Sequence, residues 1–337
     1  MGSNYKVAIL GAGVVGLSTA IEFQSRFPSC ELTLIADKFT LDTTSDGAAG
    51  LFDPSPSFMG PDFETTREWI KYSYEYYKGL LGADCGVNEI SGYVLTHCGE
   101  KYSENHYLKP ILPKYRRLSE EELADMSPGD WKFGSFLTTL TIANRIYQPW
   151  CMQMFKSRGG KIIQRHISSF SDLGKEFNFV FNCTGLGATA LCDDIFVIPI
   201  RGQIIRIQDP SIDKFYMSDY STYIVPNGYS ITLGGTQQFG NYDYRVDNYD
   251  TESILTRCSR ILPQVKTYNG PVESWVGLRP YRYCVRVEHE KTANVEIIHN
   301  YGHGGYGVTS APGSARSAVG VFETTHKTGE GNVVYKT

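Results

Sequence analysis

The feature that most constrains this chain is a glycine-rich turn close to its first residues. A short apolar run, residues 5–10, leads directly into Gly11-Ala12-Gly13-Val14-Val15-Gly16. Apolar residues then recur at helical spacing as far as Pro28, which ends the helix. A second apolar run, residues 31–36, is followed by Asp37. This order of strand, glycine turn, helix, strand and acid predicts the first unit of a doubly wound, Rossmann-type sheet.

Each glycine of the turn has its own physical purpose. Gly11 permits the tight turn after the strand, Gly13 lets a phosphate approach the backbone, and Gly16 lets the helix pack closely on the strand. The N–H groups and the dipole at the helix N-terminus would hold the anion, and Asp37 would accept hydrogen bonds from ribose hydroxyls. The motif predicts a bound dinucleotide, but it does not by itself distinguish FAD from NAD.

The rest of the chain alternates between helical and strand patterns. Helical patterns cover residues 63–81, 118–126, 150–158, 251–262 and 313–327. Strand patterns cover residues 90–96, 161–164, 177–182, 276–287 and 295–299, and residues 198–233 are rich in short strands. Because Rossmann-like segments occur at the start, middle and end with β-rich segments between them, we expect an α/β protein with two interleaved domains.

Composition narrows the classes of partner. The formal net charge is −4, which gives no basic surface for nucleic acid, and no apolar run reaches the roughly 18 residues of a membrane-spanning helix. The eight cysteines show no C-x-x-C spacing and no accompanying histidine cluster. We therefore expect free thiols and no metal site.

Several sequence blocks resemble one enzyme family. Residues 37–54 read DKFTLDTTSDGAAGLFDP. Further blocks follow in the family's order: FNCTGLGA at 181–188, IRGQI at 200–204, TYIVP at 222–226, TLGGT at 232–236, VGLRPYR at 276–282 and HNYGHGGYG at 299–307. With the glycine turn, these blocks resemble the D-amino-acid oxidase family, which includes the D-aspartate oxidases. The resemblance implies that FAD is the dinucleotide.

The resemblance also implies how the chain divides. A Rossmann-type, doubly wound FAD-binding domain would comprise residues 1–55, 150–200 and 290–330. It would be interleaved with a mainly antiparallel β-sheet substrate domain made of residues 56–149 and 201–289. The family resemblance leaves open whether the chain forms a homodimer.

The resemblance implies a large set of cofactor contacts. Beside the glycine turn and Asp37, these residues are Lys38, Thr43, Thr44, Ala49, Gly50, Leu51, Ile167, Thr184, Gly185, Gly304, Tyr306, Gly307, Val308 and Thr309. The glycines of the last block precede the final helix. A helix N-terminus near the flavin would stabilise the negative charge that develops there on reduction.

For catalysis, the resemblance implies three residues that hold the substrate. Arg279 would bind the substrate carboxylate through two hydrogen bonds, and the Tyr223 hydroxyl would add a third. The backbone carbonyl of Gly305 would accept the amine. The Cα–H would then point at flavin N5 for hydride transfer, so no protein base is needed. The products would be a 2-oxo acid, ammonia and, from molecular oxygen, hydrogen peroxide.

The substrate side chain is the least constrained part of the hypothesis. Asp53, Gln237 and Tyr220 are the candidates for its pocket. An Asp53 carboxylate would repel D-aspartate, and Gln237 brings no positive charge to offset it, so we expect neutral or basic D-amino acids to be preferred. A D-aspartate oxidase is the alternative, and a non-catalytic FAD-binding protein is the alternative of another class.

Two further expectations concern segments near the end of the chain. Ser310-Ala311-Pro312-Gly313 stands where the family usually has His-Trp-Gly. We expect the final helix to form all the same, because proline is tolerated in a first helical turn. The resemblance implies an intracellular location, either peroxisomal or cytoplasmic, although the last residues are not the Ser-Lys-Leu signal for peroxisomes.

Overall fold

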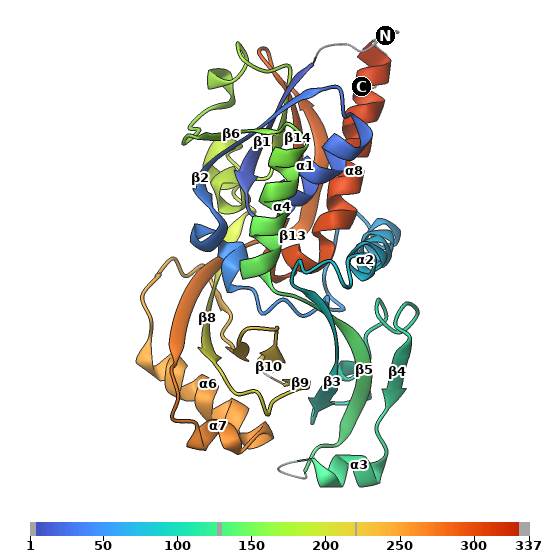
Figure 1. The fold of residues 1–337 in the computed structure, drawn as a ribbon, viewed down its shortest axis with the longest axis vertical. Helices are drawn as coiled ribbons and strands as arrows, with labels where there is room; N and C mark the ends of the chain where they lie inside the picture. Colours follow the sequence, from blue (N-terminus) through green and yellow to red (C-terminus); the bar gives the residue numbers. More distant parts are fainter. Residues whose placement is uncertain (1–4, 127–129, 220, 330–337) are drawn as a thin grey trace.

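The structure is a computed structural model that describes residues 5–126, 130–219 and 221–329, with side chains as far as residue 326. Figure 1 shows an elongated molecule whose two parts lie end to end. One part holds β1, β2, β6 and β14 with three helices, and the other holds the strands from β3 to β5 and from β8 to β10. All the strands described belong to one continuous sheet.

The first part is built on parallel strands. Their order is β14-β7-β1-β2-β6, and every neighbouring pair is parallel. The strands are β1 (Lys6–Ala12), β2 (Glu31–Phe39), β6 (Lys161–Gln164), β7 (Phe179–Asn182) and β14 (Glu296–His303). Alongside them lie α1 (Val14–Arg26), α4 (Asn144–Ser157) and α8 (Gly307–Gly329). The predicted strand, glycine turn, helix and second strand are therefore confirmed.

Aromatic packing joins this sheet to its helices. The ring of Phe322 in α8 meets those of Phe23 in α1 and Phe179 in β7, with ring centroids 5.0 and 4.8 Å apart. Phe23 also packs edge-on against Phe181. All four rings are buried, and this apolar contact presses α1 onto β1, from which the helix starts.

The second part is mainly antiparallel, with a parallel pairing of β3 and β9. Its strands are β3 (Val87–Thr96), β4 (Lys114–Arg117), β5 (Phe133–Ile142), β8 (Ile198–Ile207), β9 (Phe215–Ser218), β10 (Thr222–Pro226), β11 (Ile231–Gly234), β12 (Gln238–Phe239) and β13 (Glu273–Lys291). The remaining described helices are α2 (Phe63–Lys78), α3 (Glu120–Asp125), α5 (Ala188–Leu191), α6 (Asn248–Ile261) and α7 (Gln264–Thr267). Helix α2 packs against α8.

Strand β13 connects the two parts. It pairs antiparallel with β8 from Glu273 to Tyr281, and with β14 from Tyr281 to Lys291. Arg279 lies just before this change of partner. The strand therefore delivers that side chain to the junction between the parallel and the antiparallel regions.

Some boundaries differ from the sequence-based expectations. Helix α4 begins at Asn144 rather than at residue 150, with Pro149 inside it, and α8 begins at Gly307 rather than at residue 313. Strands β4 and β5 were not predicted. In both helices a proline, which lacks an N–H, suggested too late a start. Within the described residues, no helix is long and apolar enough to cross a membrane.

Helix α8 accommodates Pro312 because α2 supplies the missing donor. Proline cannot donate to the carbonyl four residues earlier, which is that of Val308. The hydroxyl of Tyr77 donates to this carbonyl at 2.7 Å. Helix α2 approaches closely because Gly313 has no side chain; a Cβ there would lie 2.4 Å from Cα of Trp69. The Ser310–Gly313 replacement therefore forms a tight junction between two helices.

This compensation predicts a coupled stability effect. Tyr77→Phe should lower the free energy of unfolding by about 1–3 kcal/mol, because the Val308 carbonyl is buried without a donor. In a Pro312→Ala background the same change should have a smaller effect, because the introduced alanine can donate its own N–H to that carbonyl. Denaturant unfolding of the four proteins tests this double-mutant cycle. An equal effect in both backgrounds would contradict the account.

Candidate active site

The glycine turn brings three backbone segments unusually close together. Gly11 has φ +96, and a Cβ there would lie 2.4 Å from the carbonyl oxygen of Cys183. A Cβ on Gly16 would lie 1.9 Å from the carbonyl oxygen of Gly11. A Cβ on Gly13 would approach Ser45 Oγ to 3.2 Å. Substitution at Gly11 or Gly16 therefore requires the backbone to move.

A cavity of about 1200 Å³ opens in front of this turn and runs to strand β13. It exceeds the roughly 300–1,000 Å³ of a typical small-molecule pocket, which leaves room for a dinucleotide and a small substrate together. All but one of the expected cofactor residues line it: Gly11, Ala12, Gly13, Val14, Val15, Asp37, Lys38, Thr43, Thr44, Ala49, Gly50, Leu51, Ile167, Thr184, Gly185, Gly304, Tyr306, Gly307, Val308 and Thr309. The exception is Gly16, which packs α1 on β1.

One end of the cavity is formed by exposed polar residues. Asp37 and Lys38 are exposed at the end of β2. The side chain of His166 approaches Asp37, with Nδ1 3.4 Å from Oδ2. Gln164 donates to the Asp37 carbonyl at 3.2 Å. The Asp37 carboxylate at this open end is therefore placed to accept hydrogen bonds from ribose hydroxyls.

A short segment between β2 and α2 forms one wall. Thr43 and Thr44 line the cavity, and their hydroxyls contact Gln148 Oε1 at 3.0 Å and the Leu278 carbonyl at 3.3 Å. The neighbouring Asp46 is buried and accepts hydrogen bonds from Arg145 and Arg206. Ion pairs from α4 and β8 thus hold this wall in place.

The opposite wall is the start of α8. Residues Gly304–Tyr306 form a single 3-10 turn that continues into the helix, and Gly304 has φ +56. His303 precedes the turn and is buried, with Nε2 2.9 Å from Ser314 Oγ. Burial lowers the pKa of His303 to about 3. The ring therefore stays neutral.

Arg279 lies on the cavity wall between β8 and the 304–306 turn. Its Nη1 donates to the carbonyl of Thr236 at 3.0 Å. The guanidinium lies over Gly202, where a Cβ would be 2.2 Å from Nη1, and a Cβ on Gly305 would be 3.3 Å from Arg279 Cδ. Throughout the described ranges, no carboxylate forms an ion pair with Arg279. A partly buried guanidinium without an acid favours binding of an anionic ligand.

Tyr223 lies near Arg279 in the same cavity. Glycines 234 and 235 make room for its ring, since a Cβ on either would come within 3 Å of it. Burial raises the pKa of Tyr223, and the positive charge of Arg279 opposes that rise. The hydroxyl is therefore neutral and available to donate. Arg279, Tyr223 and Gly305 all line the cavity.

Asp53 also lines this cavity, and it has a partner that the sequence did not reveal. The side-chain amide of Asn105 donates to Asp53 Oδ1 at 3.1 Å. Burial raises the pKa of Asp53 to about 6, while the hydrogen bond from Asn105 lowers it. Gln237 lines the cavity as well, but its side chain is largely exposed. Tyr220 lies outside the described residues.

Sequence reasoning missed several other residues of the cavity wall. The hydroxyl of Ser45 accepts the Val14 N–H at 3.0 Å at the start of α1. Tyr244, Trp275 and Tyr281 also line the cavity. Ser45 lies within the TTSD block and Tyr281 within VGLRPYR, so both were detectable there, whereas nothing local marks Tyr244 and Trp275.

The other arginines of β13 have acidic partners. Arg282 pairs with Asp194 at 3.0 Å, and Arg286 contacts Tyr301 and Glu290. The eight cysteines are free. In the part of the chain that the structure describes, no group of three or more His, Cys, Asp or Glu residues is arranged to hold a metal ion.

Comparison with known proteins identifies the family. A family model described as FAD dependent oxidoreductase matches residues 6–319. The chain belongs to this family. It is 33% identical to a D-aspartate oxidase of Homo sapiens, over 93% of each chain. It is 32% identical to a D-amino acid oxidase of Dugesia ryukyuensis, over 92% of this chain and 95% of that one.

Solved structures show the same fold. A glycine oxidase from Geobacillus kaustophilus superposes with a TM-score of 0.78 at 18% identity, over 96% of this chain and 95% of that one. A glycine oxidase from Bacillus cereus gives a TM-score of 0.76 at 19% identity, over 96% of each chain. The chain is thus an FAD-dependent oxidoreductase, and its residues fit the cofactor: a glycine turn that admits a phosphate, an acid at the open end, and a helix start at the other.

Gly16 provides a test of this cofactor site. Gly16→Ala should destabilise the protein by about 1–3 kcal/mol and reduce bound FAD, because the new Cβ displaces the Gly11 carbonyl. The matched control is Gly320→Ala in α8, where a Cβ meets no atom within 4 Å and helix propensity favours alanine by about 0.5–1 kcal/mol. Thermal unfolding and flavin absorbance measure both. A fully flavinated, undestabilised Gly16→Ala protein would refute the packing argument.

Proposed function

We propose that this chain catalyses the oxidative deamination of D-amino acids to 2-oxo acids and ammonia, with molecular oxygen as acceptor and hydrogen peroxide as product. The names of its relatives support this proposal. The observation that carries it is the Arg279 guanidinium, which lines the cavity with no carboxylate partner among the residues described. A small substrate that brings its own carboxylate completes this arrangement.

In this proposal the substrate is held by three groups. Arg279 binds the carboxylate through its free N–H groups, and the neutral hydroxyl of Tyr223 donates to the same carboxylate. The carbonyl of Gly305, at the start of α8, accepts from the amine. With carboxylate and amine fixed, a single enantiomer directs its Cα–H toward the cofactor, so we expect turnover of D-amino acids and not of L-amino acids.

The chemistry itself requires little from protein acids or bases. Bound FAD would supply the hydride acceptor. Asp53 is assigned to the side-chain pocket, and His303 is neutral and bonded to Ser314. The role of the chain is then to orient the substrate and to exclude water from it. A non-catalytic FAD-binding protein stays the alternative, and it would show no flavin reduction by any D-amino acid.

Removal of Arg279 tests the proposed anchor. Arg279→Ala should lower kcat/KM roughly a hundredfold or more, because two charge-assisted hydrogen bonds worth about 3 kcal/mol in total are lost. FAD should stay bound. Peroxide production from D-amino acids measures the loss, and Arg67→Ala, an exposed arginine of α2, is the control. Normal kinetics in Arg279→Ala would show that the carboxylate is bound elsewhere.

The proposed preference for neutral or basic side chains is supported by Asp53. An ionised Asp53 would repel a second carboxylate about 5 Å away by roughly 3 kcal/mol at an effective dielectric near 20. A cationic side chain would gain a similar amount, less the free energy of its desolvation. D-aspartate oxidase activity is the alternative, favoured by the 33% identity to the human D-aspartate oxidase.

The two substrate classes are distinguished by pH and by mutation. Because the pKa of Asp53 is raised to about 6, the residue is neutral below that pH and anionic above it. The ratio of kcat/KM for D-arginine to that for D-methionine should therefore increase as the pH rises through about 6. In Asp53→Asn this ratio should not change with pH. A wild-type preference for D-aspartate, or an identical pH profile in the mutant, would contradict the electrostatic argument.

The division into domains, the oligomeric state and the location of the protein also stay proposals. The discontinuous FAD-binding domain of residues 1–55, 150–200 and 290–330 is supported by the parallel strands found in those segments. Its partner, residues 56–149 and 201–289, supplies most of the antiparallel strands. The homodimer and the peroxisomal or cytoplasmic location rest on the family resemblance alone.

A further inference from the structure

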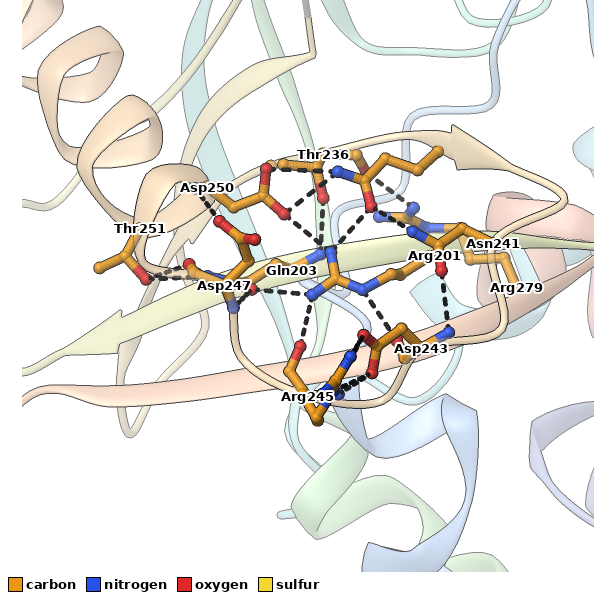
Figure 2. Close-up of polar contacts among 12 residues, drawn as sticks. Arg201, Gln203, Thr236, Asn241, Asp243, Arg245, Asp247, Asp250, Thr251 and Arg279 are labelled. Atoms are coloured by element: carbon orange, nitrogen blue, oxygen red, sulfur yellow. Dashed lines mark hydrogen bonds and ion pairs between the residues drawn. The ribbon is translucent and has the colours of Figure 1, made fainter.

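A dense polar cluster lies on strand β8 beside the proposed substrate site (Figure 2). Strand residues alternate between faces, so Arg201 and Gln203 project to the face opposite the one over which Arg279 passes Gly202. Both side chains are buried. Neither has a place in the proposed chemistry, and a buried arginine needs an explanation.

All five N–H groups of Arg201 are bonded within the described structure. Its Nε donates to the Asp243 carbonyl at 2.8 Å, and Nη2 donates to the Arg245 carbonyl at 2.6 Å. Nη1 donates to Gln238 Oε1 at 2.9 Å and to Asp250 Oδ2 at 2.7 Å. The remaining Nη2 bond goes to Gln203. Most of these acceptors belong to one segment, residues 236–250.

Gln203, two residues after Arg201 in β8, binds the same segment. Its side-chain amide donates to the Asp247 carbonyl and to Thr251 Oγ1, both at 2.8 Å, and its Oε1 accepts the Asp247 N–H at 2.8 Å. Its backbone N–H donates to Thr236 Oγ1 at 2.8 Å. Arg201 and Gln203 thus bond both ends of the loop formed by residues 236–247, the Thr236 end through the backbone N–H of Gln203. We call this segment the clamped loop.

The clamped loop depends on these bonds because it has little packing of its own. None of its side chains is buried, and Phe239, Tyr242 and Tyr244 are exposed by 59%, 63% and 61%. A segment that buries so little apolar surface is not held by the hydrophobic effect. Its position is set by polar contacts, which combine the backbone pairing of β12 (Gln238–Phe239) with β8 and the side-chain bonds of Arg201 and Gln203.

The clamped loop also forms part of the proposed substrate site. The carbonyl of Thr236 accepts from Arg279 Nη1 at 3.0 Å, and Gln237 and Tyr244 line the cavity. Thr236 is therefore bonded on one side to Gln203 and on the other to Arg279. Displacement of the loop moves the acceptor that orients the guanidinium.

We propose that Arg201 and Gln203 are positioning residues for substrate binding, which act through the clamped loop to hold Arg279 in its carboxylate-binding orientation. The inference rests on the proposed role of Arg279. In this inference, the buried charge of Arg201 aligns Arg279 and does not itself contact the substrate or the cofactor. Because the cluster lies on the far face of β8, the FAD site is not affected by it.

The test compares Arg201→Lys with wild type in the FAD-loaded enzyme. Lysine keeps the charge beside Asp250 but offers three donors from one atom, so it cannot bond both loop carbonyls and Gln238. The KM for the best D-amino acid should rise about tenfold, equivalent to about 1.4 kcal/mol, with kcat changed much less. The FAD dissociation constant should not change. The control is Arg67→Ala, an exposed arginine of α2 outside this cluster, which should leave KM at the wild-type value.

A double-mutant cycle separates alignment of Arg279 from a general structural effect. If Arg201 acts through Arg279, the Arg201→Lys, Arg279→Lys double variant should have nearly the KM of Arg279→Lys alone. If the double variant instead raises KM by the product of the two single-variant factors, the inference is overturned. If Arg201→Lys does not fold, Thr236→Val decides, because it removes the Oγ1 contact with Gln203 and should raise KM at unchanged FAD affinity.

The outcomes distinguish this inference from the proposed function. A raised KM in Arg279→Lys with wild-type KM in both Arg201→Lys and Thr236→Val would overturn the inference and leave the proposed function intact. A wild-type KM in Arg279→Lys would overturn both. Weaker FAD binding in Arg201→Lys would also overturn the inference, since a positioning effect on the substrate side does not reach the cofactor.

Discussion

The change of partner along β13 is the constraint on which both ends of the cavity depend. An antiparallel strand that pairs with β8 and then with β14 places consecutive residues of one strand against the antiparallel region and then the parallel region of the sheet. Arg279 lies two residues before the change, and the turn that follows β14 carries Gly305. The guanidinium and the start of α8 meet because a single strand carries the chain from one region to the other. A shift of register there would turn Arg279 to the opposite face.

The same junction explains why so many glycines surround an arginine. Gly202 and Gly305 each lie where a Cβ would approach the Arg279 side chain, and glycines 234 and 235 do the same for Tyr223. Strand glycines weaken a sheet, so their presence at this point indicates close approach of a functional side chain. The far face of β8 carries dense polar bonding, in which Arg201 has every donor satisfied.

Local signals let the sequence predict the first βαβ unit, because a glycine turn, a helix and an acid follow one another directly. Most of the other residues that line the cavity were predicted only through the family resemblance. The partners that set the site's electrostatics could not be predicted. Asn105 bonds Asp53 across 52 residues of sequence, and Tyr77 bonds Val308 across 231. No local pattern encodes such contacts, since tertiary folding creates them. The prolines at 149 and 312 misplaced two helix starts, and for the second the reason is again tertiary, since the Tyr77 donor that satisfies the Val308 carbonyl lies in another helix.

Two opposite charges share the cavity without neutralising each other. The pKa of Asp53 is governed by burial and by Asn105, whereas Arg279 bonds a backbone carbonyl. Tyr306 lies near both charges. Burial is the main cause of its raised pKa; the Asp53 charge raises this pKa further, and the Arg279 charge lowers it. Its phenol therefore lies within the field of each charge. If the two were direct partners, the ion pair would hold the Asp53 pKa below its ordinary value rather than raise it. Each charge is instead left for a ligand, and a substrate with an anionic end and a neutral or cationic end complements the pair.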